Sequence, residues 1–168
     1  MAKNTIRLKN YVNVFEEIEA ASAIIPGELV EIIAAGTVQV HSTEGGNVLP
    51  MFAIEDELQG KGIDEAYAAG DQVQVWIPTR GDQVYAILED GNDVVIGDFL
   101  ESNGLGEVQL HVADVGDSTV GGVDHAIVGV ALEAVTLSGS SGDESSGWGY
   151  DSVIDVLGTN RRIMIRIL

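Results

Sequence analysis

The chain has 168 residues and no cysteine, with 45% hydrophobic and only 5% aromatic residues. This length fits one domain, and the apolar fraction is too high for a disordered chain. The lack of cysteine excludes disulfides, thiolate metal sites and a thiol nucleophile. The formal net charge of −19 argues against nucleic-acid binding, which ordinarily needs a basic surface.

Positive charge is concentrated near the two ends of the sequence. Every acid lies between Glu16 and Asp155, and the cations outside that stretch are Lys3, Arg7, Lys9, Arg161, Arg162 and Arg166. This distribution has two interpretations. Either the acids form an ordinary solvated surface beside a few incidental cations, or the basic ends bind acidic surface on the same protomer, a neighbour or another protein.

Residues 1–25 predict an extended N-terminal arm. The first residues lack the apolar stretch of a signal peptide, and no segment is long enough to span a bilayer, so we expect a cytoplasm-like environment. Apolar and polar residues alternate over residues 5–15, with Ile6 and Leu8 on one face, which favours a strand. A short helix over residues 12–21 is the alternative.

Residues 26–168 predict a single β-rich domain. Short alternating segments are separated by turns rich in Gly, Pro, Asp and Asn, which predicts an all-β fold, either a small barrel or a sandwich. Residues 56–69 interrupt the pattern, with one helical turn expected over residues 64–69. A Ser- and Gly-rich segment at residues 138–149 is expected to be a loop. The predicted strands cover residues 29–33, 37–41, 48–54, 72–77, 83–88, 93–96, 107–112, 126–135 and 162–168.

No residue pattern in the chain is typical of an enzyme. Adjacent acids such as Glu16 and Glu17 are expected as solvated surface, because a catalytic pair needs one carboxyl group in a dry pocket. The glycine motifs that bind phosphates or dinucleotides are incomplete. His41, His111 and His125 lack the spacing of a helical zinc site, and two of them fall on polar faces of predicted strands. We therefore expect surface or interface histidines, with no metal site, no cofactor and no catalytic activity. Casual binding of divalent ions by the acidic surface is the alternative.

Two features late in the sequence predict contacts with a partner. Trp148 and Tyr150 border the Ser- and Gly-rich segment, where they either anchor an interface or fold back to cap the domain. Over residues 161–168, isoleucines alternate with polar residues that include Arg162 and Arg166. A strand of this kind must be paired, either within its own sheet or with a neighbouring subunit.

Residues 46–88 resemble the central region of the decoration (cement) proteins of tailed-phage heads. The motifs that carry this resemblance are LQGKGI at residues 58–63, Tyr67 followed by GDQV at 70–73, PGELV at 26–30 and VGVALEA at 128–134. The resemblance implies a small β-barrel or β-tulip-like body on the outside of a capsid. Such proteins are usually trimers that sit at three-fold or quasi-three-fold points and clamp neighbouring major capsid subunits.

We therefore expect a structural virion protein, made in the host cytoplasm and placed on the outer capsid surface. Its expected partners are the major capsid protein and itself, as a homotrimer, with neither nucleic acid nor membrane. The alternatives are a tail or head-fibre component, and a barrel that binds a small ligand or carbohydrate. The residues expected to contact the capsid or a neighbouring subunit are Lys3, Ile6, Arg7, Leu8, Lys9, Trp148, Tyr150, Arg162 and Arg166.

Overall fold

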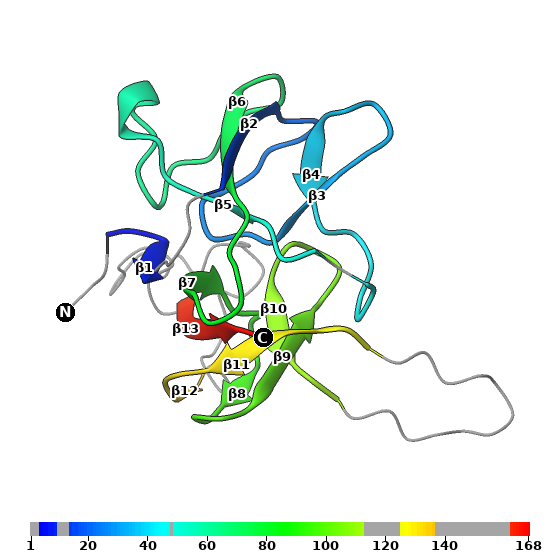
Figure 1. The fold of residues 1–168 in the computed structure, drawn as a ribbon, viewed down its shortest axis with the longest axis vertical. Coiled ribbons are helices and arrows are strands. Elements are labelled where there is room, and N and C mark those ends of the chain that lie inside the picture. Colours follow the sequence, from blue (N-terminus) through cyan, green and yellow to red (C-terminus); the bar gives the residue numbers. More distant parts are fainter. Residues whose placement is uncertain (1–3, 10–13, 48, 113–124, 137–161) are drawn as a thin grey trace, which may run out of the picture.

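Figure 1 shows the fold in the computed structural model, which describes residues 4–9, 14–47, 49–112, 125–136 and 162–168. These residues form strands and one short 3₁₀ helix, so the predicted all-β class is confirmed. Within the same ranges, no helix has the length and apolar character needed to cross a membrane. The strands are β1 (Arg7–Lys9), β2 (Phe15–Glu19), β3 (Val30–Ile32), β4 (Val38–Val40), β5 (Phe52–Ala53), β6 (Gln72–Trp76), β7 (Gln83–Ile87), β8 (Asp93–Val94), β9 (Phe99–Ser102), β10 (Val108–Leu110), β11 (Ile127–Ala131), β12 (Val135–Thr136) and β13 (Arg162–Ile167).

The strands form one large sheet and three small ones. The large sheet has the order β1-β7-β13-β11-β9-β10, and each neighbouring pair in it is antiparallel. The small sheets are β2-β6-β5, β3-β4 and β12-β8. In Figure 1 the large sheet lies in the lower half of the molecule, while β2, β3, β4 and β6 lie in the upper half. No sheet of the described residues closes into a barrel, so the sandwich is the predicted architecture that fits.

Two clusters of buried side chains form the core. The larger cluster includes Ile6, Trp76 and Ile165, which come from widely separated parts of the sequence. The smaller cluster lies among the strands of the upper half and includes Tyr67 and Val73. Valine, isoleucine and leucine supply most of the larger cluster, as the scarcity of aromatic residues predicts. Burying each such side chain contributes about 1.5–3 kcal/mol to folding.

Strand β13 lies within the large sheet, between β7 and β11. Its residues Ile163, Ile165 and Ile167 are buried, whereas Arg166 on the opposite face is exposed. Both edges of β13 are occupied by strands of the same chain. Of the two possibilities that the sequence left open, the strand therefore pairs within its own sheet.

The described part of the predicted N-terminal arm is built into the domain. Strand β1 pairs with β7, and Ile6, which precedes it, is completely buried in the larger cluster. The Thr5 hydroxyl and the Ile6 N–H both donate hydrogen bonds to the carboxylate of Glu55. Strand β2 pairs with β6 along its whole length, so the alternative helix over residues 12–21 is wrong. These residues do not form a separate arm, because the apolar side chain of Ile6 is buried in the chain's own core.

The helical turn of the insert lies at η1 (Glu57–Gln59) rather than at the predicted residues 64–69. Asp56 caps this turn by accepting a hydrogen bond from the Leu58 N–H at 3.0 Å. Gly60 ends it in the left-handed conformation, with a φ of 72°. An aspartate at the N-cap and a glycine after the last residue are the usual signals for such a turn.

We predict that Ile6→Ala lowers the free energy of unfolding by about 2–5 kcal/mol, because truncating a fully buried isoleucine leaves a cavity. Leu58→Ala is the matched control, since Leu58 is 96% exposed and its loss should cost less than about 0.5 kcal/mol. Urea unfolding followed by tryptophan fluorescence measures both variants. Equal stability of the two would mean that Ile6 does not belong to the folded core.

Candidate functional site

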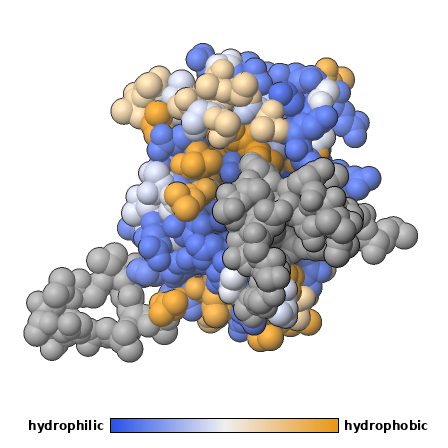
Figure 2. All heavy atoms as spheres, turned by 180° about the vertical axis from the view of Figure 1, so that it is seen from behind, coloured by the Kyte–Doolittle hydropathy of each residue, from blue (hydrophilic) through white to orange (hydrophobic). Residues whose placement is uncertain are grey.

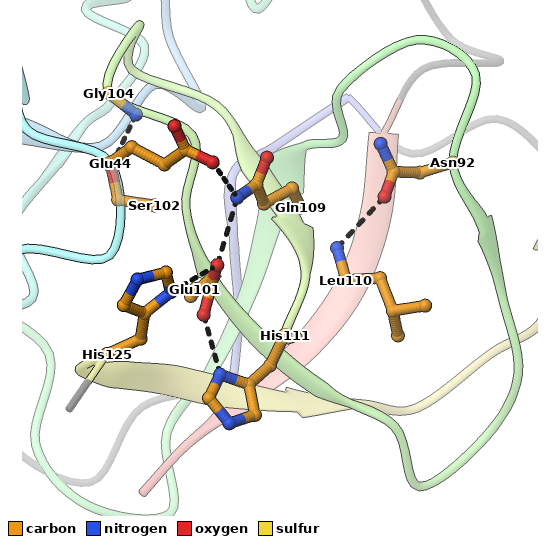
Figure 3. A network of polar contacts seen from close by, with 9 residues as sticks. All are labelled: Glu44, Asn92, Glu101, Ser102, Gly104, Gln109, Leu110, His111 and His125. Carbon is orange, nitrogen blue, oxygen red and sulfur yellow. Dashed lines mark hydrogen bonds and ion pairs between the residues drawn. The ribbon is translucent and has the colours of Figure 1, made fainter. Parts of the chain in front are cut away.

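A buried carboxylate flanked by two histidines lies on the outer face of the large sheet (Figure 3). Along β9, Leu100 is buried in the larger core cluster, and alternation therefore places Glu101 on the opposite face. Gln109 of β10 and Ile127 of β11 are the direct cross-strand partners of Glu101. Glu101 thus lies between two strands whose flanking residues can reach it.

Three side chains from neighbouring segments contact the Glu101 carboxylate. His111 lies just after β10, and its Nδ1 is 2.6 Å from Oε2 of Glu101. His125 lies just before β11, and its Nδ1 is 2.9 Å from Oε1. Gln109 donates from Nε2 to the same Oε1 at 2.9 Å, and also to Glu44 at 3.2 Å. We call Glu101, His111 and His125 the Glu–His–His cluster.

Glu101 is the innermost member of this cluster. Its side chain is 1% exposed, compared with 17% for His111 and 26% for His125. Burial is the largest single effect on the pKa of Glu101 and raises it, but hydrogen bonds from His111, Gln109 and His125 together outweigh burial. The pKa of Glu101 is therefore lowered, and the carboxylate is ionised at neutral pH. An ionised carboxylate only accepts hydrogen bonds, so each imidazole donates from Nδ1.

Gly45 makes room for the His125 ring. A Cβ at this position would lie 2.4 Å from the imidazole, and the backbone has a φ of 58°, which disfavours other residues. The Gly45 N–H donates to the Ser102 carbonyl at 2.9 Å, and the Gly45 carbonyl accepts from the Ala126 N–H at 2.8 Å. The loop before β5 is thereby fixed against both β9 and the residue next to His125.

His41 is not part of the cluster. It is 2% exposed, its Nδ1 is 2.7 Å from the Ser102 hydroxyl, and its Nε2 is 3.9 Å from Glu31. The expectation of a surface histidine is therefore wrong for His41. Its polar ring can be buried because it has a hydrogen-bond partner in the buried Ser102 hydroxyl. The expectation was incomplete for His111 and His125, because cross-strand pairing brings them to one carboxylate.

The predicted contact residues near the N-terminal end are divided between core and surface. Ile6 is buried, so it is not available to a partner. The Arg7 guanidinium lies 4.7 Å from the centre of the Phe15 ring, a distance at which a cation and an aromatic ring attract each other. Leu8 is half-buried and Lys9 is exposed.

The predicted contact residues of β13 also differ from each other. Arg162 is buried, and its guanidinium donates to the Asp64 carboxylate at 2.6 Å and to the carbonyls of Ile63 and Pro26. The prediction that Arg162 contacts a partner is corrected, because these groups of the same chain surround its charge. Arg166 is exposed. The remaining candidates Lys3, Trp148 and Tyr150, like the segment at residues 138–149, lie outside the described residues.

A group of exposed apolar side chains lies where β8 leads into β9. Val95 is 60%, Ile96 is 70% and Phe99 is 47% exposed, and we call these three residues the apolar rim. Figure 2 shows hydrophobic side chains at the lower end of the molecule, the end at which Figure 1 places β8 and β12. Exposed hydrophobic side chains that lie together commonly mark an interaction surface.

The sequence did not reveal the cluster because strand β9 was not predicted. Its residues are Phe-Leu-Glu-Ser, and both Glu101 and Ser102 are buried, so the usual alternation of apolar and polar residues is absent. Gln109 and His111 both lie on the polar face of a predicted strand in which polar and apolar residues alternate. Their spacing gave no indication of the residue opposite them, because the alternation within one strand shows which face is polar but not which strand lies beside it.

Comparison of the chain with protein-family models and with curated proteins finds no match.

We predict that Gly45→Ala displaces His125 from Glu101 and destabilises the fold by more than Gly36→Ala does. Both glycines have a positive φ, so alanine strains the backbone at either position. A Cβ at Gly36 meets no atom within 4 Å, so the difference between the two variants measures the clash of the methyl group added at position 45 with the His125 ring. Urea unfolding of both variants, with the imidazole NMR signals of His125 as a local probe, measures the difference. Equal destabilisation and unchanged His125 signals would contradict the packing described here.

Proposed function

We propose that the protein is a structural virion protein that decorates the outer surface of a phage capsid and stabilises it by binding neighbouring major capsid subunits. The observation that carries this proposal is the apolar rim, a set of exposed hydrophobic side chains on a protein with a net charge of −19. The resemblance of residues 46–88 to capsid decoration proteins supports the same assignment.

The apolar rim is held in a defined shape before any partner binds. The Val95 N–H donates to the Asp98 carboxylate at 2.8 Å, and the Asp98 N–H donates back to the Val95 carbonyl. The Gly97 N–H donates to the Ala131 carbonyl of β11 at 3.0 Å. A turn fixed in this way loses little conformational entropy on binding, so more of the apolar contact energy appears as affinity.

The charge of the chain suits a protein that must remain soluble before it binds. Strong net negative charge keeps free copies apart in solution and steers them to a surface of complementary charge. Apolar side chains at the centre of an interface with polar surroundings then hold the bound copy. Exposed cations such as Lys9 and Arg166 contribute mainly to steering, because an exposed ion pair is worth only about 0–1 kcal/mol.

The attachment surface is assigned to the apolar rim rather than to a free N-terminal arm. Ile6 lies in the chain's own core and β1 pairs with β7, so neither is free to extend across a neighbour. Removing residues 1–10 would therefore take away part of the large sheet. Such a deletion could not separate attachment from folding, whereas substitutions in an exposed turn can.

We predict that the double variant Val95→Ser, Ile96→Ser binds capsid shells at least about 30-fold more weakly than the unmodified protein, since a central interface residue contributes about 2 kcal/mol or more. The turn should persist, because its hydrogen bonds come from the backbone and Asp98. Co-sedimentation with shells that lack their own copies measures the affinity.

Leu58→Ser is the control, because Leu58 is equally apolar and more exposed but lies on η1. It should bind shells as the unmodified protein does. Loss of binding in the control with normal binding in the rim variant would place the attachment surface on the insert instead.

We further predict homotrimers at three-fold or quasi-three-fold positions of the capsid, and a cryo-EM map of decorated particles tests this arrangement. Density away from every such position would contradict it. Copies located on a tail or a fibre would assign the protein to a different part of the virion.

A further inference from the structure

We propose that Glu101, His111 and His125 bind one divalent transition-metal ion of the zinc class. This inference goes beyond capsid decoration and does not depend on it. The protein has three histidines and no cysteine, and two of the three histidines meet at one carboxylate. One ligand atom from each member of the Glu–His–His cluster lies within 4.8 Å of the others.

The electrostatics of the cluster favour a cation. Glu101 is ionised at the innermost position, and Gln109 links it to a second carboxylate, that of Glu44. Within the described ranges, the ion-pair partners of Glu101 are the two imidazoles, which carry charge only when they are protonated. A buried carboxylate is costly without a counter-charge, and a bound dication supplies one.

The ligand types select the class of ion. Two imidazole nitrogens and one carboxylate oxygen form a set used for zinc and for neighbouring metals such as cobalt and nickel. Calcium and magnesium prefer sites made entirely of oxygen ligands. Three protein ligands leave a coordination position for water, as in other zinc sites with this number of ligands.

A rearrangement of these side chains would let them hold an ion, because their ligand atoms already lie within 4.8 Å of one another. The Nδ1 atoms now lie 2.6 and 2.9 Å from the carboxylate oxygens, whereas ligands around a tetrahedral zinc ion are about 3.4 Å apart. Both imidazoles are more exposed than Glu101, so they can move outward while the carboxylate stays in place. Each Nδ1 gives up its proton to solvent and the ring retains or takes one at Nε2, so the imidazoles bind the ion in their neutral form.

A bound ion would join three parts of the sheet. Glu101 belongs to β9, His111 follows β10 and His125 precedes β11. In the described residues β10 is the last strand on its side of the large sheet. The metal would therefore add a cross-link at that side, and binding would raise the thermal midpoint of the folded protein in proportion to the logarithm of metal concentration.

Calorimetric titration of the full chain, after removal of metal with EDTA, tests the proposal. We expect saturable binding of one Zn²⁺ per chain, whereas Ca²⁺ binds only weakly to the acidic surface. Co²⁺ added to the same protein should show the visible absorption of an ion with imidazole ligands. Absence of both the zinc stoichiometry and the cobalt spectrum would overturn the proposal without any variant.

The double variant His111→Asn, His125→Asn separates this site from the many acids of the chain. An asparagine amide can still donate a hydrogen bond to Glu101, so the fold is preserved. The amide is a poor metal ligand, so the ion loses two of its three ligands. We expect zinc affinity to fall by more than about 100-fold, because even an outer-shell partner of a metal ligand is worth about 10–100-fold. Glu57→Gln is the control, because Glu57 is an exposed acid on η1 outside the cluster, and it should bind zinc as tightly as the unmodified protein. Equal zinc binding by the double variant and the unmodified protein would show that the ion binds elsewhere.

Discussion

The position of β13 between β7 and β11 is the constraint on which the large sheet depends. Without this strand, β1 and β7 would be separated from β11, β9 and β10. Its partners lie far from it in the sequence, and so does Ile6, which packs into the same core. Contacts between distant segments form only after long loops have closed, which makes sheets of this kind slow to assemble. The Glu–His–His cluster lies on the half of the sheet that β13 joins to the rest.

Arg162 shows how the same strand fixes the surrounding loops. Its guanidinium bonds to Asp64 and to the carbonyls of Ile63 and Pro26, so the insert and the start of the body are both attached to β13. Burying this charge costs desolvation energy, which is offset only because several acceptors surround it. Removing one partner of such a buried pair is strongly destabilising, which identifies Arg162 as a structural residue.

Sequence patterns predicted the strands that contain regularly spaced apolar residues between turn signals. Residues 72–77, 83–88 and 162–168 were predicted and correspond to β6, β7 and β13, which differ from them by one residue at most. The predicted strand at residues 126–135 is divided into β11 and β12. Each of these strands has a regular apolar face, and such a face identifies a strand but not its neighbour.

The errors arose where a polar residue is buried or an apolar segment has an unexpected partner. Glu101 and Ser102 are buried and polar, so β9 was missed and the cluster with it. Ile6 was assigned to an arm because its alternation with cations fits an extended segment. The same alternation fits an edge strand of the chain's own sheet, and only the pairing with β7 distinguishes the two.

Strand β9 connects the two surfaces that we propose to be functional, yet it keeps them separable. Phe99 of the apolar rim and Glu101 of the cluster lie two positions apart and therefore face the same side of the sheet. The backbone N–H of His111 donates to the Phe99 carbonyl at 2.8 Å, so the ladder between these strands positions His111 without using its side chain. Changing the imidazole therefore alters the ligands of the cluster and leaves the backbone of the rim in place. The metal site and the attachment surface can thus be altered one at a time.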